Sequence, residues 1–466
     1  MQKLYYQPEG HWFGDCMPFG YDGKFYVFHQ RDTRNPKPLR EGQPFGWSLA
    51  VTEDFVHFED YGEVLKRGEY EAQDQYIYAG SIFQAQGRFH AFYTGFNREY
   101  EAQGKPSQVL MHAVSDDLVH WDKTKDKLRF TPQPGYDPND WRDPFVFWNE
   151  EEKQYWLILG ARKLDGKKQI NGCNVYFTSE DLENWEFRGD FWAPGIFTMH
   201  EMPDLFKIGD WWYLLNSEYS DKKKIVYRMS KSLKGPWKAP ADDGFDGRAY
   251  YAGRTFEVGG QRILFGWVPT REEDDDKNNF QWGGALVAHE IFQREDNTLG
   301  VKMPDTVWAA FGERENAPRD WEMETEDSRQ EAVLLQGCGE LYSFEADVMF
   351  KKGTRDFALR LYEDEETGAA YEFKFLVGEN RMIFEKSPNF PWPQCMNMGL
   401  ERPIKLCPGE FYNIRLIVDG TIATIYVNGV ALNARMYQKP GDSLALNVTD
   451  GGLKIKNVSI AKGLKK

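Results

Sequence analysis

Residues 11–30 read HWFGDCMPFGYDGKFYVFHQ and combine an isolated acid with a run of aromatic and β-branched residues. A turn at Tyr21-Asp22-Gly23 precedes the run KFYVFHQ, whose composition is typical of a β-strand. Asp15 lies just before this hairpin, in a segment otherwise poor in charge. A lone aspartate of this kind usually caps a turn. A functional role for Asp15 therefore depends on the rest of the chain.

The same order of turn, aromatic strand and small residues occurs five times, at residues 22–30, 86–95, 152–160, 209–217 and 259–267. A second phrase, here called the turn motif, recurs between these copies as TEDFVHF (52–58), SDDLVHW (115–121) and SEDLENW (179–185). SKSLKGPW (230–237) is a variant that is one residue longer. The period of roughly 50 to 65 residues is typical of a four-stranded propeller blade. We predict a five-bladed β-propeller over residues 1–305, in which the motif turns the chain and its aromatic residue packs between blades. The alternative is a β-sandwich with chance similarity.

The last third of the chain follows a different pattern. Residues 313–330 are highly charged and predict a surface strand or a linker, whose bounds we place at 306–330. Alternating strands follow at 341–350, 357–362, 371–376, 411–418, 421–427 and 453–460, with hairpin turns at Asp419-Gly420 and Asn428-Gly429. Closely spaced strands without helical periodicity indicate a β-sandwich over residues 331–466. The predicted fold is therefore all-β, a propeller followed by a sandwich.

The composition narrows the possible partners. A net charge of −16 over 466 residues argues against a nucleic acid or an anionic membrane surface. Five scattered cysteines without a CxxC pair predict neither a zinc site nor a disulfide framework, so we expect no metal and no cofactor. The N-terminal sequence MQKLYYQPEGHW resembles no signal peptide, and no segment has the apolar length of a membrane span. We expect a soluble, cytoplasmic protein, whose oligomeric state the sequence leaves open.

Three phrases place an acid near the start of a blade and follow it with proline. They are FGDCMP with Asp15, WRDPFVF with Asp143 and HEMPDLF with Glu201. The inner strands of a propeller line a central channel, so residues distant in sequence converge there. Glycoside hydrolysis requires two carboxyl groups, and a third adjusts the proton donor or holds the substrate. Each acid alone fits a turn; together, with Arg142 beside them, they predict a glycosidase acting on a small carbohydrate.

These motifs resemble those of glycoside hydrolase family 32, the β-fructofuranosidases that include invertase, inulinase and levanase. The family's Trp-Met-Asn-Asp-Pro-Asn-Gly motif is matched by residues 12–18, its Arg-Asp-Pro motif is intact at 142–144, and its Glu-Cys-Pro motif becomes Glu-Met-Pro at 201–203. Further similar phrases lie at 46–57, 78–81, 92–95, 281–290, 416–419 and 426–429. The resemblance thus extends over nearly the whole chain.

The resemblance implies a role for each matched residue. Asp15 would be the nucleophile and Glu201 the general acid/base, while Asp143 and Arg142 would bind fructosyl hydroxyls and support the transition state. The other implied sugar-binding residues are Gln30 and Ser81, with Trp47 or Trp282 as an apolar wall. Hydrolysis would retain configuration through a covalent fructosyl-enzyme, with the two carboxyl groups about 5 Å apart and no metal.

The chain departs from the family around the nucleophile. Gly14 replaces the asparagine, residues 16–18 (CMP) replace Pro-Asn-Gly, and Met202 replaces the cysteine after the acid. The substrate therefore stays open among sucrose, a phosphorylated sucrose, inulin and levan, as do exo or endo action and hydrolysis or transfer. One alternative is an inverting family 43-type arabinofuranosidase or xylosidase. Another is a carbohydrate-binding protein without catalysis.

Overall fold

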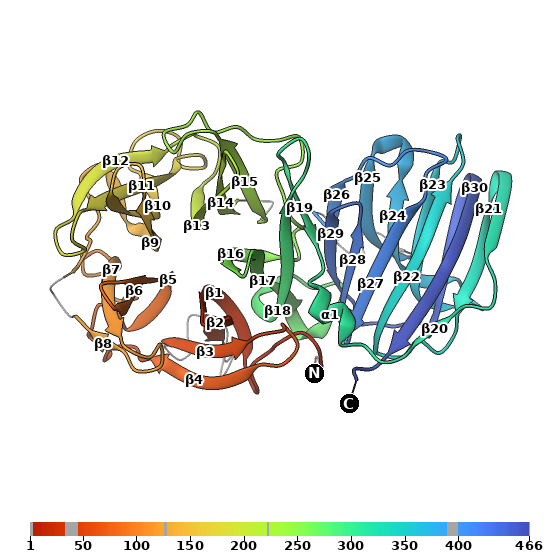
Figure 1. Cartoon of the computed structure of the whole chain (residues 1–466), viewed down its shortest axis with the longest axis horizontal. Helices are drawn as coiled ribbons and strands as arrows, with labels where there is room; N and C mark the ends of the chain where they lie inside the picture. Colours follow the sequence, from red (N-terminus) through yellow and green to blue (C-terminus); the bar gives the residue numbers. More distant parts are fainter. Residues whose placement is uncertain (1–2, 33–44, 125–127, 221–222, 389–398, 466) are drawn as a thin grey trace.

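The structure is a computed structural model that describes residues 3–32, 45–124, 128–220, 223–388 and 399–465. It consists of two all-β parts that lie side by side, a ring of strands and a layered sandwich (Figure 1). Helical turns in the described residues are confined to α1 (Asp305–Ala309), η1 (Glu272–Asp274) and η2 (Val377–Glu379). None of the helices in these ranges is long and apolar enough to cross a membrane.

The ring is a five-bladed propeller, as predicted, and each blade is an antiparallel meander. Blade I contains β1 (Trp12–Tyr21), β2 (Lys24–Asp32), β3 (Trp47–Thr52) and β4 (Glu59–Leu65); blade II contains β5 (Tyr76–Ala85), β6 (Arg88–Phe96), β7 (Gln108–Ser115) and β8 (Asp122–Lys123). Blade III contains β9 (Tyr136–Asn149), β10 (Gln154–Lys163), β11 (Gly172–Ser179) and β12 (Glu186–Trp192); blade IV contains β13 (Met199–Ile208), β14 (Trp211–Tyr219) and β15 (Ile225–Ser230). Blade V contains β16 (Tyr251–Val258), β17 (Gln261–Arg271), β18 (Phe280–Gln293) and β19 (Leu299–Lys302).

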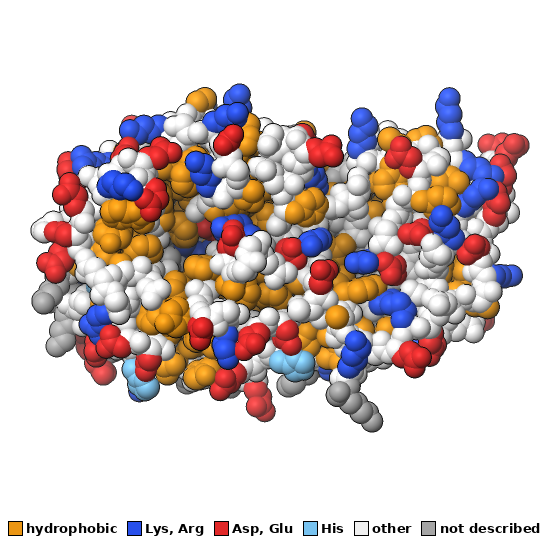
Figure 2. Space-filling model, in the orientation of Figure 1, with side chains coloured by type: hydrophobic (Ala, Val, Ile, Leu, Met, Phe, Trp, Pro, Cys, Tyr) orange, Lys and Arg blue, Asp and Glu red, His pale blue; other side chains and the backbone are white. Residues whose placement is uncertain are grey.

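The first strands of the blades form the inner wall of the ring. Each of β1, β5, β9, β13 and β16 contacts the first strand of the next blade, and β16 contacts β1. A further pairing between Phe13 of β1 and Gly284 of β18 joins blade V to blade I and closes the ring. Figure 2 shows hydrophobic side chains gathered around the hollow at the centre of this ring, with charged side chains scattered over the outer rim.

The turn motif works as the sequence predicts. In the copy at 115–121, the Ser115 hydroxyl accepts the N–H groups of Asp117 (3.2 Å) and Leu118 (2.9 Å), which ends β7 and turns the chain. The same bonds recur in the copies at 52–58 and 179–185. The terminal Trp121 packs its ring against Phe28 of blade I, with the ring centroids 5.8 Å apart. Trp185 packs in the same way against Phe92 of blade II, so the copies at 115–121 and 179–185 each turn their own blade and contact the blade before it.

The sandwich is built around one long strand, β30 (Ser443–Lys462), which pairs with strands on both of its edges. The other strands are β20 (Arg314–Asn316), β21 (Trp321–Leu335), β22 (Leu341–Phe350), β23 (Asp356–Asp364), β24 (Ala369–Leu376), β25 (Arg381–Ser387), β26 (Glu401–Pro403), β27 (Tyr412–Asp419), β28 (Ile422–Val427) and β29 (Val430–Arg435). Together they form the predicted C-terminal β-sandwich.

The range 306–330, expected to be a linker or a surface strand, belongs largely to the folded parts. It holds most of α1, all of β20 and the first part of β21, and both strands pair with β30. The dense charge of β21 reflects alternation: Met323 and Thr325 are buried, whereas the neighbouring Glu322, Glu324 and Glu326 face solvent. The sandwich therefore begins inside the predicted linker.

A buried polar cluster, here called the interdomain cluster, joins the sandwich to the propeller. Its members are Asp246, His289, Tyr426 and Asn433. The two nitrogens of the His289 ring lie 3.1 Å from Asp246 Oδ2 and 2.8 Å from the Tyr426 hydroxyl, and Asn433 donates to Asp246 Oδ2 at 2.7 Å. Since every member has a partner in this network, it fixes blade V against the sandwich.

Candidate active site

Each of the five innermost strands is interrupted by a β-bulge. The breaks in register fall between Phe13 and Cys16 in β1, Tyr78 and Gly80 in β5, Arg142 and Phe145 in β9, Glu201 and Asp204 in β13, and Tyr251 and Arg254 in β16. A bulge redirects side chains and tolerates proline, because one residue leaves the ladder. The bulges therefore explain why Pro144 and Pro203 follow the acids of β9 and β13.

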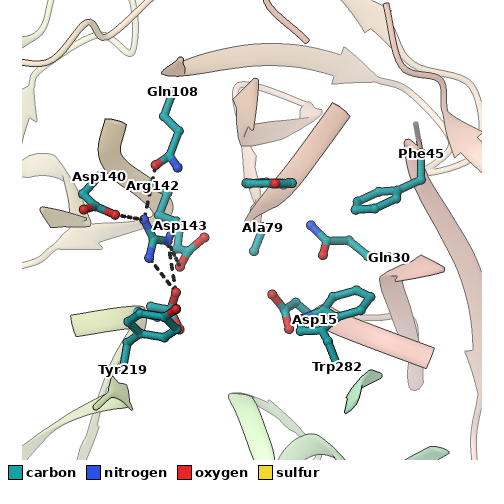
Figure 3. Close-up of a pocket in the computed structure, with 12 residues that line it drawn as sticks. Asp15, Gln30, Phe45, Ala79, Gln108, Asp140, Arg142, Asp143, Tyr219 and Trp282 are labelled. Carbon is teal, nitrogen blue, oxygen red and sulfur yellow. Dashed lines mark hydrogen bonds and ion pairs between the residues drawn. The ribbon is translucent and has the colours of Figure 1, made fainter. Parts of the chain in front are cut away.

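The bulges direct side chains into one cavity of about 310 Å³. Its lining residues are Asp15, Gln30, Phe45, Tyr78, Ala79, Gln108, Asp140, Arg142, Asp143, Glu201, Tyr219 and Trp282. Figure 3 shows Asp15 and Trp282 on one side, facing Arg142 and Asp143 on the other. The structure thus brings together all three predicted acids with Arg142, Gln30 and Trp282.

Arg142 is held between two carboxylates. Its Nε and Nη2 donate to Glu201 Oε1 at 3.2 and 2.6 Å, and its Nη1 donates to Asp140 Oδ1 at 2.7 Å. Asp140 is fixed in turn by Arg162, which donates to its other oxygen at 2.7 Å. The guanidinium is therefore rigidly oriented, and it fixes one oxygen of Glu201.

Asp143 is almost fully buried, with 4% of its surface exposed. Its Oδ2 accepts the N–H of Met202 at 3.0 Å, and its own N–H donates to Thr94 Oγ1 at 2.9 Å. Burial raises the pKa of Asp143 to about 6, although the positive charge of Arg142 opposes this shift. These contacts hold the carboxyl on the cavity wall beside Arg142.

Asp15 lies across the cavity on β1. Its Oδ1 accepts the indole N–H of Trp267 at 3.0 Å. Burial raises the pKa of Asp15 to about 8, and the nearby charge of Asp143 adds to the shift. Both causes act in the same direction, so the carboxyl group of Asp15 keeps its proton to a higher pH than an exposed aspartate does. The described residues contain no group of three or more His, Cys, Asp or Glu side chains placed to hold a metal ion.

Two polar residues of blade V support the acids, and the sequence analysis did not identify them. Tyr251 donates its hydroxyl to Glu201 Oε2 at 2.5 Å, and Trp267 donates to Asp15. Blade V carries no acid motif, so no local pattern marked these residues. The one available signal was that Trp267 ends the fifth copy of the aromatic repeat. The other lining residues that were missed as site residues are Phe45, Tyr78, Ala79, Gln108, Asp140 and Tyr219.

Two predicted sugar-binding residues do not line the cavity. Trp47 is fully buried, packs against Phe28 and Tyr93, and donates its indole N–H to the Tyr78 carbonyl at 3.0 Å. It lies on the third strand of blade I and belongs to the core. Ser81 lies beyond the β5 bulge, where its hydroxyl accepts the N–H of Val146 at 3.1 Å and borders a separate cavity. Neither side chain therefore borders the cavity that holds the three acids; of the two tryptophans expected as candidates for the apolar wall, Trp282 does.

The structure also accounts for the glycine before the nucleophile. A Cβ atom on Gly14 would lie 2.1 Å from the Trp282 ring, so no larger residue fits while the indole stays there. The same indole stacks on Phe45, with the ring centroids 6.3 Å apart. Gly14 and Trp282 therefore form a matched pair that shapes the cavity beside Asp15.

Comparison with known proteins agrees with this geometry. The model of the glycosyl hydrolases family 32 N-terminal domain matches residues 5–299. The levanase of Bacillus subtilis is 24% identical, over 98% of this chain and 69% of that protein. A sucrose-6-phosphate hydrolase of Escherichia coli is 22% identical, over 95% of this chain and 91% of that protein.

Solved structures show the same fold over the whole chain. Fructan 1-exohydrolase IIa from Cichorium intybus matches with a TM-score of 0.79 at 16% identity, covering 100% of this chain and 97% of that one. Sucrose-6-phosphate hydrolase from Lactobacillus gasseri matches with a TM-score of 0.77 at 17% identity, covering 100% and 93%. The architecture of a five-bladed propeller followed by a sandwich is therefore shared from end to end.

Proposed function

The chain belongs to glycoside hydrolase family 32 and is a glycosidase of the β-fructofuranosidase type, and from this premise we propose that it releases fructose from β-fructofuranosides with retention of configuration. The observation that supports this most directly is the meeting of Asp15, Asp143 and Glu201 in one cavity from three separate blades. Retention requires a nucleophile and an acid/base on opposite sides of the scissile bond.

In the first step, Asp15 attacks the anomeric carbon of the fructosyl unit while Glu201 protonates the departing oxygen. Trp267 donates to Asp15 Oδ1, so Oδ2, which accepts no hydrogen bond from the described residues, is the oxygen that forms the new bond. The product is a covalent fructosyl-enzyme. In the second step, Glu201 removes a proton from water, and the oxygen of that water displaces Asp15.

Asp143 and Arg142 act on the sugar rather than on the bond. Both line the cavity opposite Asp15, where a carboxylate and a guanidinium are able to hold ring hydroxyls. The negative charge of Asp143 also favours the positive charge that develops on the sugar in the transition state. Gln30 lines the cavity opposite the β1 bulge, and we assign it to substrate binding.

The natural substrate is tested by assaying fructose release from sucrose, a phosphorylated sucrose, 1-kestose, inulin, levan and an aryl β-fructofuranoside. We expect fructose from at least one of them, and a rate that falls by about a thousandfold or more in Asp15→Ala. Release of arabinose or xylose instead, from the matching furanosides, would favour the family 43-type alternative. Unchanged turnover in Asp15→Ala would exclude Asp15 as the nucleophile.

A further inference from the structure

Blade V holds the nucleophile and the acid through one pair of facing residues. Tyr251 on β16 and Trp267 on β17 are direct partners in the antiparallel register, and their rings pack edge to face with the centroids 5.7 Å apart. Tyr251 donates to Glu201 Oε2 and Trp267 donates to Asp15 Oδ1. A displacement of this pair would thus disturb both carboxyl groups at once.

The two oxygens of Glu201 have different partners. Oε1 accepts two N–H groups of Arg142, which occupy its lone pairs. A guanidinium keeps its protons and offers no acceptor, so a proton on Oε1 would meet only donors. Oε2 has Tyr251 as its partner. The proton that Glu201 donates and recovers is therefore carried by Oε2.

The Tyr251 hydroxyl has two acceptors within reach. It lies 2.5 Å from Glu201 Oε2 and 3.4 Å from the main-chain carbonyl of Glu218. Burial, reinforced by the charge of Glu201, raises the pKa of Tyr251 well above its usual value of 10, so the phenol keeps its proton. The hydroxyl is a donor at every working pH, and only the acceptor that it serves can change.

We propose that Tyr251 is a positioning residue that follows the charge of Glu201 through the reaction. While Oε2 carries the proton, the Tyr251 hydroxyl donates to the Glu218 carbonyl. When the Oε2–H bond breaks and the proton passes to the leaving oxygen, the hydroxyl turns and donates to the new carboxylate. When water returns a proton to Oε2, the hydroxyl turns back. This inference rests on the proposed role of Glu201 as acid/base.

The facing residue fits the different task of the nucleophile. An indole N–H donates and never accepts. Asp15 alternates between a carboxylate and a fructosyl ester, and it never donates a proton in the proposed reaction. A fixed donor on Asp15 Oδ1 suits both states. The pair therefore places a fixed donor on the nucleophile and a switchable hydroxyl on the acid/base.

The test compares two leaving groups in the variant Tyr251→Phe, which keeps the ring and removes the hydroxyl. The substrates are the natural fructoside that the wild-type protein cleaves best and an aryl β-fructofuranoside with an acidic phenol. The parameter kcat/KM reports the first step, in which only the poor leaving group needs a proton. We expect a loss of at least about tenfold on the natural fructoside and of less than about threefold on the aryl substrate. In Trp267→Phe we expect similar losses of kcat/KM on the two substrates, because cleavage of either one requires the nucleophile Asp15.

Tyr250→Phe is the matched control. The Tyr250 hydroxyl donates to the carbonyls of Leu264 and Val287, away from the acids, so its loss should leave the ratio of the two kcat/KM values unchanged. Glu201→Gln separates the proposed role of Glu201 from that of Tyr251. If this variant lowers kcat/KM equally on both substrates, the proposed acid role of Glu201 is wrong. If Glu201→Gln lowers kcat/KM mainly on the natural fructoside, whereas Tyr251→Phe lowers it equally on both substrates or on neither, only the role of Tyr251 is overturned.

Discussion

Replacing Asp15 with asparagine should stabilise the empty protein, and the gain should grow with pH. Burial, together with the charge of Asp143, raises the pKa of Asp15 from its ordinary value of 3.8 to about 8. The folded state therefore binds this proton more tightly than the unfolded chain does. The resulting stability is complete below pH 3.8 and is lost as the pH rises toward 8. Asparagine removes the titration while keeping an oxygen for the Trp267 N–H.

The size of the effect follows from the same shift. Each pKa unit corresponds to about 1.4 kcal/mol, and pH 7 lies about 3 units above the ordinary value, which gives an upper bound of about 4 kcal/mol. The cavity admits water and the protein relaxes around a charge, so we expect about 2 kcal/mol at pH 7. At pH 4.5 the gain should fall below about 1 kcal/mol.

The assay is urea unfolding of the wild-type protein and Asp15→Asn at pH 4.5 and pH 7, without sugar. Asp143→Asn is the matched control: the pKa of Asp143 rises only to about 6, and its carboxylate accepts the Met202 N–H, so its gain should be smaller. A neutral or destabilising Asp15→Asn at pH 7 would refute the reasoning, as would an equal gain at both pH values.

Three further predictions concern the cavity, the domain junction and the pH profile. Gly14→Ala should lower kcat/KM by about tenfold, because the added Cβ displaces the indole of Trp282 from its place beside Asp15. Gly378→Ala is the control and should leave kcat/KM unchanged, because a Cβ at that position meets open space. His289→Ala should lower the free energy of unfolding by about 2–4 kcal/mol without changing kcat/KM, because it leaves Asp246 and Tyr426 of the interdomain cluster without their histidine partner. His57→Ala, at an exposed histidine, is the control. Equal free energies of unfolding for the two variants would contradict the role of the cluster. In a plot of kcat/KM against pH, the acidic limb should have its midpoint above pH 4. Asp15 must ionise before it attacks, and burial raises its pKa. A midpoint at or below pH 4 would contradict the assignment of Asp15 as the nucleophile.

The repeats made the propeller predictable from the sequence. Blades I to III have the same tight turn after their third strands, and Ser115-Asp-Asp-Leu builds this turn with side-chain caps that the sequence displays directly. The charged strand β21 was harder to recognise, because its pairing partner β30 lies more than a hundred residues away. Local composition records the exposed face of such a strand but not its partner.

The candidate site was predictable where the motif and the function coincide. A proline follows each of the three acids, and for Asp143 and Glu201 it lies in the bulge that turns the acid into the cavity. No such signal marks Tyr251, since its role arises from a contact between blades. The sequence could not decide between Trp47 and Trp282 as the apolar wall. Whether a side chain points to the channel or to the core depends on its strand and on the bulge, and a shift of one residue reverses its direction.

The anomer of the fructose that is released first tests the central claim most directly. Proton NMR during the first minutes of hydrolysis, before mutarotation, distinguishes the two furanose forms. The proposed attack by Asp15 followed by water predicts that β-fructofuranose appears first, with the configuration of the substrate. The first appearance of the α anomer would mean inversion, and would remove Asp15 as a covalent nucleophile.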